Sequence, residues 1–450
     1  MSEQKYSSRP LELVNATRRF LTFLPHSGFN NQRIALENAM LLAYILNCTL
    51  VAPPVRLGEP LPYRPFDTLK KWNHNASRPK PRYCVHFTHL PDCASYNSFV
   101  QMPWSDLVDF RSVQKELGLD LIFARGSQTP HQVLRQMGIP NESITFLKDK
   151  EPYQYLIRDS FDKDEHMDFA SRYQDEWSLD YLRNILDSAA VIHFGSLFGT
   201  GRLKLHNSAY AAARTKIHST MAISHPGVLD TANAIRSKIV GSATNNSPYL
   251  AVHVRVGGRK FRVAAKENGR LIWWELIARL GVSQETGIEL EHRFLRERKK
   301  SVKPPVPPDL QFFPKNSTSP VLFNGTNPHV APSGKTIACP SSTSRSGPRV
   351  SNLEIPLFIA TDAPNPRAHS SLAIFYATFP CVFTLADFRD ELGLLNVFRD
   401  GDGLPVGDFL VPLVDAVVAG QAAYVIGTRN STFSNFVTDI LHPAYAVRHV

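Results

Sequence analysis

The chain has 450 residues, of which 43% are hydrophobic and 20% are charged, and its formal net charge is +10. This length allows two or three domains with sizeable cores, and the composition is that of an ordinary soluble globular protein, which excludes disordered and fibrous classes. The positive charge suits an acidic partner such as a phosphate-bearing substrate, a nucleic acid or an anionic membrane, and a merely basic surface explains it equally well.

Cysteine usage and the N-terminal segment give little information about the compartment. Five cysteines in so long a chain are not a disulfide framework, and no Cys-x-x-Cys pair suggests a structural zinc site. Cys84 and Cys93 are close enough in sequence to form a disulfide across a short loop, but reduced buried cysteines are more common and are expected here. The tail at 1–17 lacks the apolar run of a signal peptide, and no stretch is long enough to span a membrane.

The first half of the chain is expected to be an α/β unit over residues 18–225. A buried strand at 19–25, an amphipathic helix at 32–47 and a second buried strand at 48–54 predict a βαβ unit with parallel strands. A further strand is expected at 189–195, followed by helices.

The second half, residues 226–450, is expected to be another α/β unit. Buried strands are predicted at 248–255, 355–361, 381–385 and 422–427, and helices near 227–240, 367–378, 407–420 and 433–442. An insertion at about 285–352 interrupts this unit. Residues 301–350 contain 10 of the 33 prolines with many Ser and Thr, a composition that predicts disorder.

Polar clusters directly follow the buried strands. These clusters are His26–Gln32, Gly195–Arg202, Arg255–Arg259, Asp362 and Arg429–Ser434. In open parallel sheets ligands bind outside the carboxyl ends of the strands, so two such halves predict a cleft lined by these loops.

Each cluster has both a ligand-binding and a structural interpretation. Gly28 in the first loop permits close approach to an anion at a helix start, or is a plain turn. His253 and Arg255 share one side of a strand, where an arginine can hold a phosphate bidentately; alternatively they are a core histidine and a surface arginine. The hydroxyls of Ser431–Ser434 suit phosphate or an N-cap box. Asp362 suits a ribose or base, or a helix cap.

Together these clusters predict a pocket for a charged nucleotide diphosphate. The sequence has no Walker-type glycine-lysine loop, which disfavours a nucleoside triphosphatase, and no clustered carboxylates that would hold a divalent metal.

The order and spacing of four motifs resemble the GDP-fucose protein O-fucosyltransferase family. The motifs are "GFNNQ" (28–32), "HVR" (253–255), "FIATDA" (358–363) and "STF" (431–433), and the resemblance covers roughly 18–260 and 353–441. It implies an α/β fold of the GT-B type, in which two Rossmann-like domains face each other across a cleft. It also implies an inverting transfer of fucose from GDP-fucose without a metal or other cofactor.

The resemblance assigns roles to individual residues. Arg255 would hold the β-phosphate and stabilise the leaving group, and Ser431 and Thr432 would donate to the phosphates. Phe433 would pack near the nucleotide, and His253 and Asp362 would contact the nucleoside side. Gly28, Phe29 and Asn30 would belong to the donor-binding loop, and Asn31 would lie by the reacting centre.

Two positions depart from the family pattern. Some members carry a glutamate as catalytic base where this chain has Ser27, and many show an acid where it has Gly258. Removal of the acceptor proton would then need His26, a water relay or the departing phosphate.

The sequence therefore predicts a fucosyltransferase that binds GDP-fucose and acts on a hydroxyl of a protein (Ser/Thr) or glycan acceptor, with no nucleic-acid partner. The alternatives are a non-catalytic nucleotide-sugar or glycan-binding protein and an enzyme that uses another GDP-sugar. The resemblance suggests the ER or Golgi lumen, whereas the absence of a visible signal peptide leaves the cytoplasm as the alternative.

Overall fold

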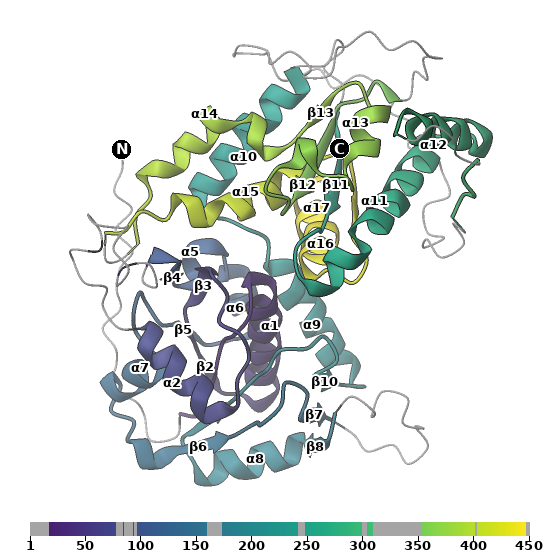
Figure 1. Cartoon of the computed structure of the whole chain (residues 1–450). Coiled ribbons are helices and arrows are strands. Elements are labelled where there is room, and N and C mark those ends of the chain that lie inside the picture. Colours follow the sequence, from purple (N-terminus) through teal and green to yellow (C-terminus); the bar gives the residue numbers. More distant parts are fainter. Residues whose placement is uncertain are drawn as a thin grey trace, which may run out of the picture. The chain divides into compact units, whose positions relative to one another are not determined.

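The computed structural model describes residues 18–77, 84, 93, 97–159, 173–241, 248–298, 304–308, 353–400 and 403–446. These residues form two compact units (Figure 1). The first contains the described residues up to His225 together with Val397–Phe409, and the second contains those of Pro226–Asn396 and from Leu410 onward. The tail expected at 1–17 lies outside the described residues. The return of Val397–Phe409 to the first unit was not predicted.

The first unit is built on a parallel sheet. Its strands are β1 (Phe20–Phe23), β2 (Thr49–Ala52), β3 (Val55–Gly58), β4 (Phe99–Met102), β5 (Leu121–Phe123), β6 (Ile144–Leu147), β7 (Tyr155–Arg158), β8 (Asp175–Ser178), β9 (Val191–Phe194) and β10 (Leu203–Lys204). Its helices are α1 (Phe29–Leu46), α2 (Phe66–Ala76), α5 (Trp104–Leu107), α6 (Arg111–Leu117), α7 (Pro130–Gln136), α8 (Leu179–Ser188) and α9 (Ser208–Thr220).

Five of these strands form a parallel sheet in the order β5-β2-β1-β9-β6. The expected strand–helix–strand unit is confirmed as β1, α1 and β2, although α1 begins at Phe29, three residues earlier than expected. Helix α1 packs against β1 and β2, while α7 contributes Val133 and Leu134 to a core cluster with Phe20 and Val51. A parallel sheet β10-β7-β8 and an antiparallel pair β3-β4 complete the unit.

The second unit contains a four-stranded parallel sheet in the order β13-β12-β11-β14. Its strands are β11 (Leu250–Val254), β12 (Leu357–Thr361), β13 (Val382–Phe383) and β14 (Tyr424–Gly427). Its helices are α10 (Pro226–Gly241), α11 (Arg259–Arg279), α12 (Gln284–Arg298), α13 (Ala373–Thr378), α14 (Arg389–Leu392), α15 (Gly407–Gly420, which begins in the first unit), α16 (Thr432–Asn435) and α17 (His442–Ala446), with a π-helix at Phe436–Leu441 between the last two. Short 3-10 turns lie at Pro366–Ala368, Leu385–Asp387 and Gly393–Val397, and another lies at Asn141–Ser143 in the first unit. Both units are thus α/β with parallel sheets, as the sequence predicts.

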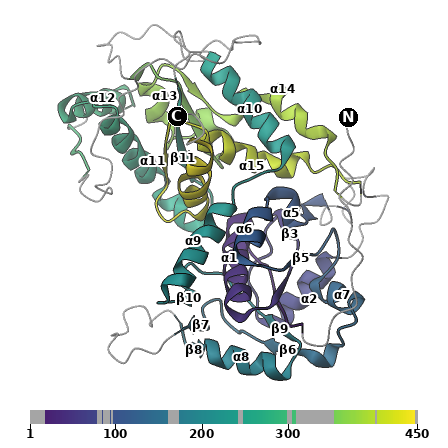
Figure 2. The ribbon, with the colours of Figure 1, turned by 180° about the vertical axis from the view of Figure 1, so that it is seen from behind.

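The expectation of disorder from about residue 285 is wrong for the start of that segment, because Gln284–Arg298 forms α12. Glu291 is buried, and its carboxylate accepts hydrogen bonds from Arg270 Nε at 2.6 Å and from Trp274 Nε1 at 2.9 Å, both on α11. Gly287 lets the Trp274 ring approach, since a Cβ there would lie 2.6 Å from it. Figure 2 shows α12 beside α11. Most of the remaining insertion lies outside the described residues.

The expectation of reduced cysteines is also wrong in part. Cys84 and Cys93 are fully buried and form a disulfide, and Cys381 is disulfide-bonded as well, whereas Cys48 is a buried free thiol. Within the described part of the chain, no helix combines the length and apolar character needed to cross a membrane.

Candidate functional site

Three of the predicted polar loops meet at one edge of the sheet in the second unit. Strand β11 lies between β12 and β14, with Val254 paired to Thr361 and His253 paired to Gly427. Because the strands are parallel, the loops that follow them emerge at the same carboxyl edge, where ligands bind in such sheets. The structure therefore brings Arg255, Asp362 and the segment 428–434 together, as the sequence predicts.

Arg255 is held at this edge from two directions. Its Nε lies 3.0 Å from Asp362 Oδ2 and 3.3 Å from the Gly257 carbonyl, and its backbone amide donates to Thr428 Oγ1 at 2.9 Å. About a third of the side chain is exposed, at 35%. Among the described residues, neither of its terminal nitrogens has a hydrogen-bond partner, so both can donate to an oxyanion.

Asp362 positions the loop that carries Arg255. Its Oδ1 accepts from the amides of Val256 at 2.8 Å and Gly257 at 3.1 Å, while Oδ2 pairs with Arg255. The backbone of this loop lies so close to Asp362 that a Cβ on Gly257 would be 2.4 Å from the Asp362 carboxylate. The nucleoside contact expected of Asp362 stays a prediction; the contacts in the structure are those of a loop anchor. Gly258, where relatives carry an acid, has a φ of +84°, a conformation that favours glycine.

His253 is a buried neutral histidine behind an aromatic ring. It is 2% exposed, its Nδ1 lies 2.6 Å from Ser434 Oγ, and its ring centroid lies 4.6 Å from that of Phe433. Burial lowers the pKa of His253 to about 3, so the ring is uncharged at neutral pH. Phe433 is half-buried.

The segment after β14 makes a tight helix start. Asn430 has a φ of +59°, and the Ser431 hydroxyl, only 3% exposed, accepts from the Ser434 amide at 3.3 Å as the N-cap of α16. The N-cap interpretation of this motif is therefore confirmed for Ser431. This bond uses the oxygen of the hydroxyl and not its hydrogen, so the expected donation of Ser431 to phosphate stays a prediction. Thr432 is half-buried at the first position of α16 and remains a candidate donor.

Sequence reasoning missed Thr428, which connects β14 to β11. Its Oγ1 accepts from the Arg255 amide and donates to the His253 carbonyl at 3.0 Å, and it is 1% exposed. The signal was available, because Thr428 is the first hydroxyl after a buried strand, but the predicted cluster began one residue later.

The remaining predicted residues lie in the first unit, in the loop between β1 and α1. Gly28 is the N-cap of α1, and Phe29 packs on Trp104 with ring centroids 5.6 Å apart. Asn30 is buried, and its Oδ1 has no hydrogen-bond partner in the described part of the chain. Asn31 is half-buried in the first turn.

Gln32 fixes this loop to β3. Its side-chain nitrogen donates to the carbonyls of Ser27 at 3.0 Å and Arg56 at 2.9 Å, and its oxygen accepts from the Arg56 amide at 2.9 Å. Ser27 has a φ of +66°, unusual for a residue with a side chain. Glutamine in "GFNNQ" therefore holds a strained loop ahead of α1.

The structure does not support His26 as an exposed general base. The ring is 4% exposed, with Nδ1 2.8 Å from Ser27 Oγ and Nε2 2.6 Å from Ser196 Oγ. Burial and the positive charge of Arg202 lower the pKa of His26 to about 4. With both nitrogens engaged and so low a pKa, His26 is a positioning residue for its loop.

The polar cluster Gly195–Arg202 also proves to be structural. Arg202 is fully buried, and its guanidinium donates to the carbonyls of Tyr155 at 2.6 Å and Phe198 at 2.9 Å. The Ser196 amide donates to Asp149 at 2.9 Å, and no room remains for a Cβ at Gly195, which would lie 1.9 Å from that carboxylate. The polar groups of Arg202 and Ser196 are thus hydrogen-bonded within the protein and hold this loop in place.

Comparison with known proteins identifies one curated relative and a set of solved structures; no family model matches the chain. O-fucosyltransferase 30 of Arabidopsis thaliana is 32% identical over 135 residues, which are 27% of this chain and 26% of that protein. The chain thus matches about a quarter of the length of this relative.

The solved structures include POFUT1 in complex with GDP-fucose, with a TM-score of 0.41 and 11% identity over 95% of this chain and 96% of that one. POFUT1 in complex with GDP gives a TM-score of 0.40 with the same identity and the same shares of the two chains. Over the segment that aligns with the Arabidopsis protein, the chain is O-fucosyltransferase-like in sequence, which confirms the resemblance that its motifs predict.

Proposed function

We propose that this protein is a glycosyltransferase of the GT-B type that moves fucose from GDP-fucose to a hydroxyl group of a protein or glycan. The observation that carries the proposal is Arg255, whose terminal nitrogens have no partner among the described residues at the carboxyl edge of a parallel sheet. The sequence similarity to an O-fucosyltransferase supports the same donor and the same type of acceptor group.

Arg255 would stabilise the leaving group. Cleavage of the fucosyl bond leaves negative charge on the β-phosphate of GDP, and a preorganised cation next to that phosphate lowers the barrier. Asp362 and Thr428 hold the guanidinium and the backbone of Arg255 before any ligand binds, so little reorganisation is needed. We propose that this arginine, rather than a metal ion, supplies the positive charge, and that the transfer inverts the configuration at the sugar.

The nucleoside would lie against Phe433. Behind that ring His253 is neutral and bonded to Ser434, which fixes the position of Phe433 without adding a charge. Thr432 at the start of α16 would donate to the phosphates. We propose donor binding for Gly28, Phe29 and Asn30 of the first unit, and a place by the reacting centre for Asn31.

A non-catalytic binding protein is the second candidate, and one observation favours it. Ser27 stands where some relatives have a carboxylate, and His26 has a pKa of about 4 with both nitrogens engaged, so neither is a good base at neutral pH. If transfer occurs, the acceptor proton leaves through a water relay or to the departing phosphate.

The test is GDP release from GDP-fucose in the presence of a panel of protein and glycan acceptors. Arg255→Ala is expected to lower turnover by roughly 10²–10³-fold, because it removes one preorganised charge stabiliser. Arg262→Ala removes the same charge from an exposed position one turn into α11 and is the matched control. Near-wild-type turnover in Arg255→Ala would refute the mechanism. GDP-fucose binding by the wild type without turnover on any acceptor would favour the second candidate.

A further inference from the structure

The first unit contains a cavity of about 420 Å³ that is not lined by any of the candidate residues described above. It lies at the carboxyl ends of β1, β2 and β9 and is walled by α2 and α7. His193 of β9 is paired in register with Thr22 and with Phe146, so its side chain projects from the same face of the sheet as theirs. Cavities of this volume typically hold small molecules. We call it the histidine cavity.

The histidine cavity is basic. Among the described residues that line it are Lys70, His74, His131, Arg135 and His193, and none of its described lining residues is an aspartate or glutamate. The nearest acid on α2, Asp67, is paired with Lys148 at 2.8 Å. Within the described part of the chain, Lys70 and Arg135 have no carboxylate partner. Burial and the charge of Lys148 lower the pKa of Lys70, while the charge of Asp67 opposes them, so Asp67 offsets part of the Lys70 charge without forming an ion pair with it.

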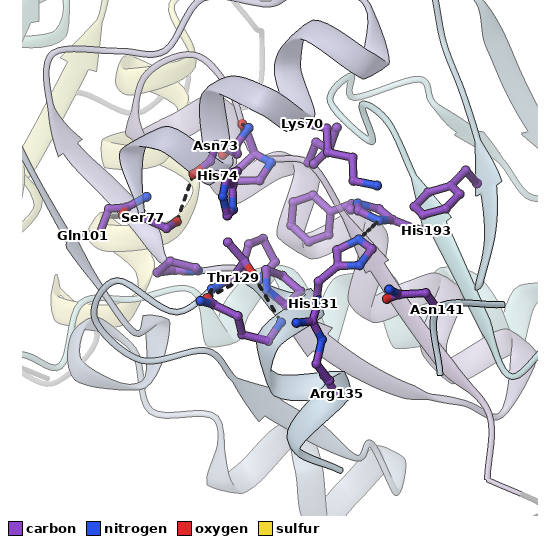
Figure 3. A pocket seen from close by; sticks show the side chains of 18 residues that line it. Lys70, Asn73, His74, Ser77, Gln101, Thr129, His131, Arg135, Asn141 and His193 are labelled. Atoms are coloured by element: carbon purple, nitrogen blue, oxygen red, sulfur yellow. Dashed lines mark hydrogen bonds between the residues drawn. The ribbon is translucent and has the colours of Figure 1, made fainter. Parts of the chain in front are cut away.

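Two histidines join these charges at the base of the cavity. His131 Nε2 lies 2.7 Å from His193 Nδ1, and Figure 3 shows Lys70, His131 and His193 pointing toward one another. Burial together with the charges of Lys70 and Arg135 lowers the pKa of His131 to about 4, so the ring is neutral at pH 7. Positive charge at the cavity thus comes from Lys70 and Arg135.

His193 leaves one polar atom unsatisfied in this cavity. The residue is 1% exposed, and its Nε2 is buried with no hydrogen-bond partner among the residues that the structure describes. If His131 Nε2 donates to His193 Nδ1, the proton of His193 lies on Nε2 and needs an acceptor. Buried polar groups in native proteins are rarely left unpaired, so in this tautomer a ligand oxygen that accepts from Nε2 would complete the hydrogen bonding of His193.

We propose that the histidine cavity binds a small organic anion, whose carboxylate or phosphate oxygen accepts a hydrogen bond from His193 Nε2 and whose charge is balanced by Lys70 and Arg135. None of the residues assigned to fucosyl transfer lines this cavity.

The rest of the lining is largely apolar and favours an anion that carries an apolar group. Phe23, Leu24, Pro53, Pro130 and Phe146 make up much of the wall. The ring of Phe146 stacks on His131 at 5.7 Å with an interplanar angle of 13°, and Lys70 Nζ lies 4.0 Å from the centroid of the same ring. A flat apolar group can pack on this wall while its acid group reaches the nitrogens.

Calorimetric titration of the full chain with four probes tests the proposal. Benzoate and phenyl phosphate carry the two acid groups on one apolar ring, benzamide is the neutral control, and inorganic phosphate has the charge without the ring. We expect saturable binding of benzoate or phenyl phosphate, the stronger of the two identifying the acid group. Lys70→Met or Arg135→Met should weaken it at least about tenfold, the loss expected when one charge-assisted contact is removed.

Lys71→Met is the matched control, because Lys71 is the next residue of α2, is exposed and does not line the cavity. It should leave the affinity unchanged within about twofold. The proposal is overturned if benzamide binds as tightly as benzoate, if inorganic phosphate binds as tightly as phenyl phosphate, if Lys71→Met weakens binding as much as Lys70→Met, or if folded wild-type protein binds none of the probes.

Discussion

Replacing Thr428 tests whether the end of β14 holds the Arg255 loop in place. The Thr428 hydroxyl accepts from the Arg255 amide at 2.9 Å and donates to the His253 carbonyl at 3.0 Å, in a place that is 1% exposed. In Thr428→Val the shape is kept, but the Arg255 amide loses its acceptor. The His253 carbonyl keeps a second donor, the Thr428 backbone amide at 3.0 Å.

The expected cost is that of one unsatisfied amide, about 1–3 kcal/mol in the free energy of unfolding. Urea unfolding measures this directly, with Thr428→Ser as the control that keeps the hydroxyl. The same loss should loosen the Arg255 backbone and weaken GDP binding in the valine variant more than in the serine variant. Equal stability and equal GDP affinity in the two variants would refute the assigned role of this hydroxyl.

Three further changes probe other parts of the structure. Gly427→Ala should lower the free energy of unfolding by about 1–3 kcal/mol, since its Cβ would lie 2.5 Å from Ser434 Cβ. Gly393→Ala should be nearly neutral in the same urea experiment, because Gly393 has open space around it and a helical φ of −56°. The double variant Cys84→Ala/Cys93→Ala should lose roughly 2–3 kcal/mol, the value for closing a loop of this length, and an unchanged Tm would contradict the disulfide. Because burial lowers the pKa of His253 to about 3, the unfolded chain binds a proton at this residue more readily below pH 6.5, and acidification from pH 7 to pH 5 should cost about 2 kcal/mol of stability through His253 alone, in addition to the losses from other buried histidines such as His26 and His131. His253→Gln should lose correspondingly less over that interval, and an equal loss in both proteins would show that this histidine is not the cause.

The sequence predicted most of what positions the second-unit site. Buried apolar runs identified β11, β12 and β14, and the rule that ligands bind at the carboxyl ends of parallel strands predicted that the loops with Arg255 and Asp362 line one cleft. What the sequence could not supply is how each polar atom is used. Ser431 caps a helix, and Asp362 binds backbone amides, because neighbours distant in sequence decide those contacts.

Elsewhere the prediction failed for identifiable reasons. A highly charged helix such as α12 is stabilised by the contacts of Glu291 with Arg270 and Trp274, which composition does not reveal. The histidine cavity was not predicted at all, since His131 and His193 lie 62 residues apart and neither belongs to a motif. Short strands such as β7, β8 and β10 carry too few residues for their alternation to be recognised.

The most direct test of the central claim is calorimetric titration of the wild-type protein with GDP-fucose and GDP, with GDP-mannose and UDP as controls. The account predicts saturable binding of GDP and GDP-fucose, weakened in Arg255→Ala and retained in Arg262→Ala, with no binding of UDP. A folded protein that binds no guanine nucleotide would contradict it.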